Sequence, residues 1–142
     1  MNMGFIIEAN KGEILTQSGF YEPIIYLKES FKNCDNAISV NVMLATELKK
    51  YNLKERSFRA RSCLDKVLVD LPDEIVIKDF DVLFNPQYKI DVIVTLINAC
   101  RRKKFAAIWP GIYKNGKLIY AEEGFADYKV YEVKNYDITC VI

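Results

Sequence analysis

The chain has 142 residues, of which 51% are hydrophobic and 27% are charged, and 20 basic against 19 acidic residues give a formal net charge of +1. These values are typical of one globular domain and exclude a disordered chain or one attracted as a whole to nucleic acid or anionic lipid. The sequence contains no histidine, which excludes Ser-His and Cys-His nucleophile pairs and imidazole acid–base catalysis.

The first half of the chain predicts short strands and three helices. Residues 5–9 indicate a strand, whereas the apolar residues of 22–31 recur at near-helical intervals and predict a helix. A short strand is expected at residues 37–42. Two helices follow at 44–51 and 57–69, each with leucines on one face.

The second half begins with a β-branched strand at residues 74–78 and continues with an amphipathic helix at 90–103. The dipeptide Asn115-Gly116 is the strongest hairpin signal in the chain, because Asn-Gly suits a type I′ turn. Further strands are expected at residues 105–109, 128–133 and 137–142.

This order of elements predicts an α/β fold. Strands alternate with helices through the middle of the chain, which indicates right-handed crossovers and a mainly parallel sheet in a three-layer arrangement. The C-terminal hairpin is expected to add an antiparallel edge to that sheet. No linker or repeat divides the sequence, so residues 1–142 are expected to form a single domain.

Two carboxylates at the end of a strand are the most informative feature for function. The run Ile75-Val76-Ile77 leads to Asp79 and Asp81, which is how the Walker B strand of a P-loop nucleotide hydrolase reads. Asp79 is the candidate Mg²⁺ ligand, and both acids are candidate catalytic residues, one for the metal and one for an attacking water. The alternative is that both acids cap a solvated turn.

A phosphate-binding loop is the other half of such a site, and its standard form is missing from this sequence. There is no GxxxxGK[ST] motif, whose backbone N–H groups and lysine hold the phosphates. The polar stretch after the first predicted strand offers Lys11, Gly12 and Gly19 as nucleotide-binding candidates. Bulky Ile14 and Leu15 separate the two glycines, so an ordinary loop is the competing interpretation.

Basic and aromatic residues supply the remaining candidates. A basic run closes the helix predicted at 90–103, and a Trp-Pro-Gly sequence ends the strand after it. These residues either contact nucleic acid or a partner, or serve as a solvated helix end and as core packing. The candidate contact residues are Arg101, Arg102, Lys103 and Trp109. A second basic cluster with an interleaved aromatic ring contains Arg56, Phe58, Arg59 and Arg61.

Aromatic residues crowd the last third of the chain. Tyrosine is favoured at partner surfaces because it offers a large apolar area with a polar end, and it is equally suited to half-exposed strands. The group is therefore a candidate partner surface or a part of the sheet. Its members are Tyr113, Tyr120, Phe125, Tyr128, Tyr131 and Tyr136.

The segment from Ile38 to Tyr131 resembles the small P-loop protein called the F subunit of BREX (bacteriophage exclusion) phage-defence systems. The matching pieces, in their order and spacing, are Ile38-Ser39-Val40-Asn41-Val42, Leu44, Leu48, residues 79–86, Asp91, Leu96, Arg101, Trp109, Gly111, residues 118–122, Gly124 and Tyr128. The resemblance implies a P-loop NTPase-like domain related to the RecA-like and AAA+ folds. Its N-terminal phosphate-binding loop (Walker A) is degenerate in this chain.

The resemblance and the missing loop together predict a non-hydrolysing P-loop-like protein that acts as a protein-binding subunit of a bacterial phage-defence assembly. On this interpretation no cofactor is needed, and the partners are other protein subunits. Two alternatives stay open: an active Mg²⁺-dependent ATPase with a divergent loop around Lys11–Gly19, and a small nucleic-acid-associated domain that contacts DNA. A homo-oligomer is compatible with each of these interpretations.

The sequence also predicts a cytoplasmic protein without a membrane segment. No window approaches the roughly 18 uninterrupted apolar residues of a transmembrane helix, and the N-terminus lacks the basic start and long apolar core of a signal peptide. The four cysteines stand far apart without a CxxC pair, which is typical of a reduced cytoplasmic protein.

Overall fold

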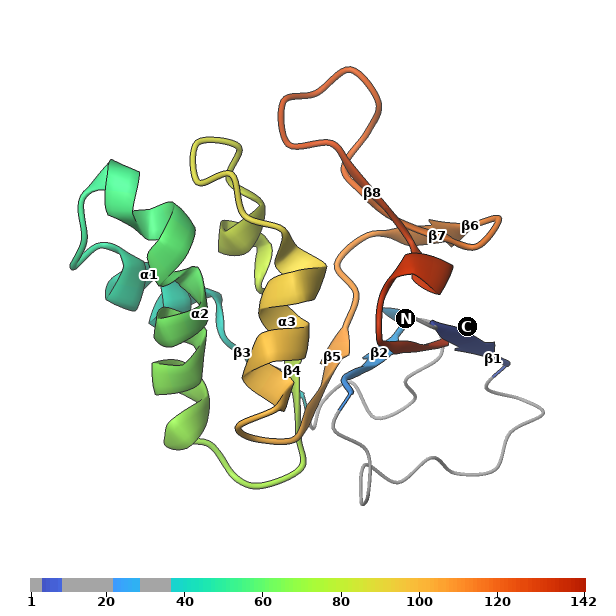
Figure 1. Ribbon diagram of the computed structural model, residues 1–142, viewed down its shortest axis with the longest axis horizontal. Coiled ribbons are helices and arrows are strands. Elements are labelled where there is room, and N and C mark those ends of the chain that lie inside the picture. The colour runs from blue at the N-terminus through green and yellow to red at the C-terminus, as the bar shows by residue number, and fades with distance from the viewer. Residues whose placement is uncertain (1–3, 9–21, 29–36) are drawn as a thin grey trace.

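Six parallel strands form the central sheet of the computed structural model, which describes residues 4–8, 22–28 and 37–142 (Figure 1). The strands are β1 (Phe5–Ile7), β2 (Ile24–Tyr26), β3 (Ile38–Ser39), β4 (Ile75–Lys78), β5 (Phe105–Ile108) and β9 (Thr139–Val141). Their order across the sheet is β1-β9-β2-β5-β4-β3, and every pairing is parallel. The α/β class with a mainly parallel sheet is therefore confirmed.

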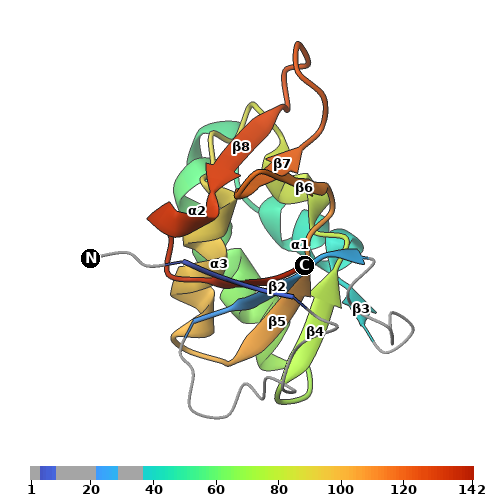
Figure 2. The ribbon, with the colours of Figure 1, turned by 90° about the vertical axis from the view of Figure 1, so that its right-hand side faces the viewer.

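Three helices lie together on one face of this sheet (Figures 1 and 2). They are α1 (Asn41–Leu48), α2 (Leu53–Val69) and α3 (Val92–Cys100). α2 begins with a capping box, in which Asn52 and Glu55 each accept the backbone N–H of the other. The described part of the chain thus has one helical layer, whereas the expected three-layer arrangement requires two. None of its helices combines the length and the apolar character of a membrane span.

Alternating residues of the central strands divide the core between the two faces of the sheet. Ile25 and Ala107 point toward the helices and belong to the main core with Leu64 of α2. Ile24 and Ala106 lie on the opposite face in a separate small cluster with Val141. Because both faces of these strands are buried, their sequences read as continuous apolar runs rather than as alternating patterns.

This burial on two faces explains an error in the sequence-based prediction. The apolar residues of 22–31 indicated a helix, but Ile24–Tyr26 form β2 in the interior of the sheet. A short apolar run fits both structures equally well, and only the pairing partners decide between them. A smaller error concerns residues 37–42, where the strand ends at Ser39 and α1 begins at Asn41.

Three further strands form a second, antiparallel sheet whose strands do not pair with those of the first. Its strands are β6 (Ile112–Lys114), β7 (Lys117–Tyr120) and β8 (Lys129–Glu132), in the order β6-β7-β8. Asn115 (φ 51°) and Gly116 (φ 80°) form the turn between β6 and β7, as the Asn-Gly signal predicts. The expectation that this hairpin would be an edge of the main sheet is wrong, because the hairpin belongs to its own sheet and β9 runs parallel between β1 and β2.

Candidate functional site

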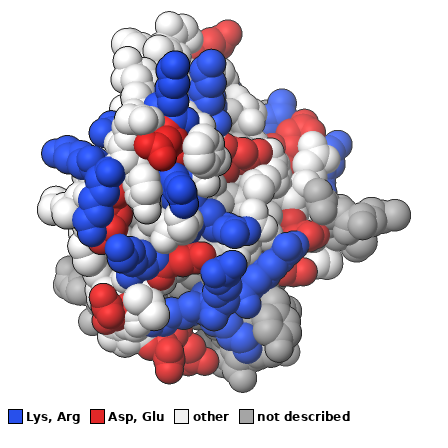
Figure 3. All heavy atoms as spheres, turned by 60° about the vertical axis from the view of Figure 1, so that its left-hand side comes forward, with Lys and Arg blue, Asp and Glu red and all other residues white. Residues whose placement is uncertain are grey.

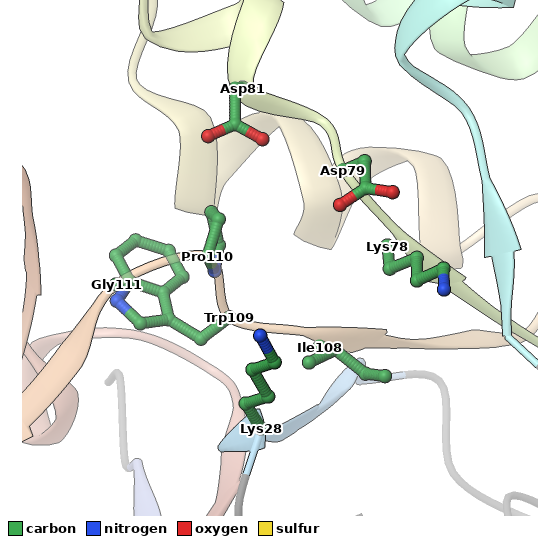
Figure 4. Close-up of a pocket in the computed structure, with 8 residues that line it drawn as sticks. All are labelled: Lys28, Lys78, Asp79, Asp81, Ile108, Trp109, Pro110 and Gly111. Carbon is green, nitrogen blue, oxygen red and sulfur yellow. The ribbon is translucent and has the colours of Figure 1, made fainter. Parts of the chain in front are cut away.

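The carboxyl ends of three neighbouring strands meet at one edge of the main sheet. β5 pairs in parallel with β2 on one side and with β4 on the other, so the residues that follow these strands lie side by side. They line a pocket of about 310 Å³ (Figure 4). The lining residues are Lys28, Lys78, Asp79, Asp81, Ile108, Trp109, Pro110 and Gly111.

Asp79 and Asp81 both face this pocket, so the structure brings together the two acids that the sequence singled out. Figure 4 shows their carboxylates on one side of the space and the Lys28 side chain entering from the opposite side. Asp79 follows β4 in the left-handed conformation, with φ 55°, which Asp adopts more readily than most residues. The exposed Asp79 carboxylate is accessible to a ligand.

Asp81 is held by the second sheet. It is the first residue of a short 3₁₀ helix, η4 (Asp81–Phe84), and its Oδ2 accepts a hydrogen bond of 2.9 Å from the Tyr120 hydroxyl of β7. The Tyr120 ring stacks on Phe84, with 3.8 Å between ring centroids and 7° between the planes. Burial, together with the hydrogen bond to Asp81, raises the pKa of Tyr120 well above its ordinary value. This pair therefore fastens η4 to the second sheet.

We expect a Tyr120→Phe variant to lose about 1–2 kcal/mol of unfolding free energy, because the Asp81 carboxylate loses its donor while the stack on Phe84 remains. Urea denaturation followed by circular dichroism measures this loss. The matched control is Tyr113→Phe, since the Tyr113 hydroxyl makes no hydrogen bond within the described residues. Equal stability of Tyr120→Phe and the unchanged chain would show that the Asp81 contact does not fasten the sheets.

Trp109 connects β5 to the second sheet from within the core. Its side chain is 1% exposed, and its Nε1 donates a 3.0 Å hydrogen bond to the carbonyl oxygen of Ile119. The indole meets Phe84 edge-on at 5.5 Å and Tyr131 edge-on at 5.9 Å. The residue offered by the sequence as a partner contact is thus packed in the interior, which is the alternative that the sequence left open.

Gly111, two residues later, allows the two sheets to approach closely. A Cβ at this position would lie 1.9 Å from the carbonyl oxygen of Ile119 and 2.9 Å from Nε1 of Trp109. Only glycine leaves room for the indole hydrogen bond and for the backbone of β7. The Trp-Pro-Gly sequence therefore lines the pocket and packs the main sheet against the second sheet.

The basic run after α3 lies at the other end of β5 and does not reach the pocket. Arg101 and Arg102 are exposed, and a guanidinium nitrogen of Arg102 lies 3.6 Å from an Asp65 carboxylate oxygen. The half-buried Lys103 instead donates hydrogen bonds to the carbonyl oxygens of Leu68 and Leu71 at the end of α2. Arg101 and Arg102 remain candidates for contact with nucleic acid or a partner protein, whereas Lys103 binds backbone carbonyl groups of its own chain.

The two pocket lysines and Tyr120, which binds Asp81, were not predicted as site residues from the sequence. Lys28 follows β2, which was interpreted as a helix, so its place at the sheet edge could not be inferred. Lys78 directly precedes Asp79, and a strand-end lysine beside a candidate metal ligand was an available signal. Tyr120 was noted only as one of a group of aromatic residues. The predicted nucleotide-binding residues Lys11, Gly12 and Gly19 lie outside the described residues.

Two carboxylates in the pocket lining, those of Asp79 and Asp81, would be the ligands for a magnesium ion, which proteins commonly bind through one or two carboxylates with waters and phosphates. Within residues 4–8, 22–28 and 37–142, no group of three or more Asp, Glu, Cys or His side chains is placed to hold a metal ion. Asp81 accepts the Tyr120 hydrogen bond through Oδ2, which leaves its second carboxylate oxygen, and the neighbouring Asp79 is exposed. Comparison of the chain with protein-family models, with curated proteins and with solved structures finds no match.

Proposed function

We propose that this chain is a degenerate P-loop NTPase-like protein that binds other proteins instead of hydrolysing ATP, as a subunit of a bacterial phage-defence assembly. The strand order supports the fold part of this proposal. In RecA-like and AAA+ folds, the phosphate-loop strand, a sensor strand and the Walker B strand are neighbours in that order. β2, β5 and β4 are neighbours in the same order here, and Asp79 directly follows β4, which agrees with the proposal.

The main support for the absence of ATP hydrolysis is the sequence that follows β2. If β2 is the phosphate-loop strand, the loop would directly follow it at residues 27–36, and not follow the first strand at Lys11–Gly19, where the sequence-based prediction put its candidates. That stretch, Leu-Lys-Glu-Ser-Phe-Lys-Asn-Cys-Asp-Asn, contains no glycine. A phosphate cradle needs backbone N–H groups at close approach to the ligand, which glycine permits and larger residues obstruct. This sequence therefore supports a site that keeps the carboxylate of Asp79 but lacks a phosphate-binding loop.

The other two catalytic positions support the same conclusion. The polar γ-phosphate sensor of such folds would stand at the end of β5, where this chain has the buried Trp109. Asp81, the candidate for orienting water, accepts a hydrogen bond from Tyr120. Both positions thus contribute to packing between the two sheets. This arrangement is expected of a nucleotide fold that is kept as a scaffold.

The second sheet offers a surface for a protein partner. Ile112, Ile119 and Val130 are aligned across its three strands on one face, and Ile112 and Val130 are 59% and 41% exposed. Phe125 in the loop between β7 and β8 is 63% exposed. The tyrosines of this region that face the core, such as Tyr131, are buried, so the exposed apolar residues are the better candidates for contact. Membership of a phage-defence assembly rests on the sequence resemblance over residues 38–131.

An active ATPase is the second candidate, because the exposed Asp79 carboxylate and Lys28 face each other across the pocket (Figure 4). Thermal denaturation with and without ATP and Mg²⁺ separates the two. A bound nucleotide raises the melting temperature by mass action, so the proposed function predicts no increase at millimolar ATP with Mg²⁺. An increase that disappears in Asp79→Ala would contradict the proposal and support the ATPase. Asp73→Ala, an exposed acid before β4, is the matched control.

A further inference from the structure

The exposed side of α2 carries cations around an unburied aromatic ring. Lys54, Phe58 and Arg61 follow one another at intervals of four and three residues, so they form one stripe along the helix. All three are exposed, and Phe58 is 70% exposed. The Phe58 ring is thus open to solvent between two cations, where a ligand with a flat apolar surface can stack on it.

Arg59 lies about 100° further round the helix than Phe58, and aromatic rings on both sides hold its guanidinium in place. Its guanidinium carbon lies 5.1 Å from the ring centroid of Tyr51 and 6.0 Å from that of Phe58. The neighbouring Arg56 has a different role, because it donates hydrogen bonds to the carbonyl oxygens of Leu48 and Tyr51 within the fold. We call Lys54, Phe58, Arg59 and Arg61 the basic-aromatic face.

The acidic residues near this face are already occupied. Glu47 is paired with Lys50 at 2.9 Å and with Lys66 at 3.6 Å. Glu55 closes the capping box at the start of α2. Within the described residues, no carboxylate lies within ion-pair distance of Lys54, Arg59 or Arg61, although Asp65, one turn after Arg61 and paired with Arg102, feels the charge of Arg61. Residues 49–61 contain six basic residues and one acidic residue, so this part of a nearly neutral chain is strongly positive.

The basic run after α3 joins the far end of the same surface. The ion pair between Arg102 and Asp65 places that run beside α2, and the helix rises about 16 Å from Lys54 to Asp65. Figure 3 brings this side forward and shows Lys and Arg side chains across it, with acidic side chains between them. The two basic clusters of the sequence are thus parts of one elongated surface.

We infer that the basic-aromatic face binds single-stranded nucleic acid, with phosphates at Lys54, Arg59 and Arg61 and a base stacked on Phe58. Cations spaced along a helix match a phosphate backbone, and an exposed ring supplies the stacking platform that unpaired bases use. A duplex keeps its bases stacked inside and would leave Phe58 without a partner. This inference does not depend on the proposed function, because the face uses neither the pocket nor the second sheet.

Fluorescence anisotropy of a labelled oligothymidine of about 15 nucleotides, long enough for a typical single-strand site, tests the inference. Between about 50 and 200 mM salt, we expect the logarithm of the affinity to fall against the logarithm of the salt concentration with a slope near −2, for three neutralised phosphates. Lys54→Gln and Arg61→Gln should each reduce the steepness by about 0.7. Phe58→Leu should weaken binding at least about fivefold with the slope unchanged, and Phe58→Tyr should restore it.

The control is Lys114→Gln with Lys117→Gln, which removes two charges from the β6–β7 hairpin and should leave both affinity and slope unchanged. Absence of binding at low salt, or equal affinity for a duplex of the same length, overturns the inference. So does an equal loss in the hairpin control. Displacement of the oligonucleotide by polyglutamate at equal charge also overturns it, because the face would then be a site for acidic proteins.

Discussion

Replacing Trp109 with alanine is expected to lower the free energy of unfolding by about 3–5 kcal/mol. The side chain is 1% exposed and contacts Ile119 and Tyr131 of the second sheet. Its removal leaves a cavity between Phe84 and Tyr131, whose rings pack edge-on against the indole, and leaves the Ile119 carbonyl oxygen without its donor. The substitution should therefore weaken the packing of the whole second sheet against the rest of the domain, and not only change the pocket.

Urea denaturation followed by circular dichroism measures this loss, since Trp109 is the only tryptophan and the variant has no indole fluorescence. Trp109→Phe is the graded control, because it keeps an aromatic ring and removes the indole N–H. It should fall between the unchanged chain and the alanine variant. A Trp109→Ala variant as stable as the unchanged chain would show that the second sheet is not held by the Trp109 contacts.

Replacing Gly111 with alanine should cost about 2–3 kcal/mol, although it adds only one methyl group. That methyl carbon would lie 1.9 Å from the carbonyl oxygen of Ile119, so the strand β7 must move away from β5 and the indole hydrogen bond must lengthen. Backbone atoms cannot adjust as a flexible side chain can. The loss should be visible both in unfolding free energy and in a changed near-ultraviolet signal of Trp109.

Gly124→Ala is the matched control for this substitution. Gly124 has φ 95°, and a Cβ there would meet nothing within 4 Å. Its replacement should cost only about 1 kcal/mol, from backbone strain without a collision. If the Gly111 variant were as stable as the Gly124 variant, the backbone of β7 would not lie as close to Gly111 as described.

Elements with strong local signals could be predicted from the sequence. The helix stripe of α3, the β-branched run of β4 and the Asn115-Gly116 turn each follow from residues close together in the chain. β2 could not, because Ile24 and Ile25 are buried on opposite faces by neighbours from distant parts of the chain. The separate second sheet was missed for the same reason, since strand partners are not encoded locally.

The candidate site was predicted only in part. Asp79 and Asp81 stood out because acids at the end of an apolar strand are a recognisable pattern, and the structure places both at the pocket. Their difference in role could not be predicted, because it depends on Tyr120, which follows Asp81 by 39 residues in sequence. Lys28 was missed together with β2. Contacts between the sheets therefore decide what the acids can do.

In the proposed function, this fold keeps the acid of a nucleotide site without a place for the triphosphate. Isothermal titration calorimetry of the full chain with ATP and Mg²⁺ tests it most directly. We expect no binding heat beyond dilution, both for the unchanged chain and for Asp79→Ala. Saturable binding that requires Mg²⁺ and is abolished by Asp79→Ala would contradict it and identify a working nucleotide site.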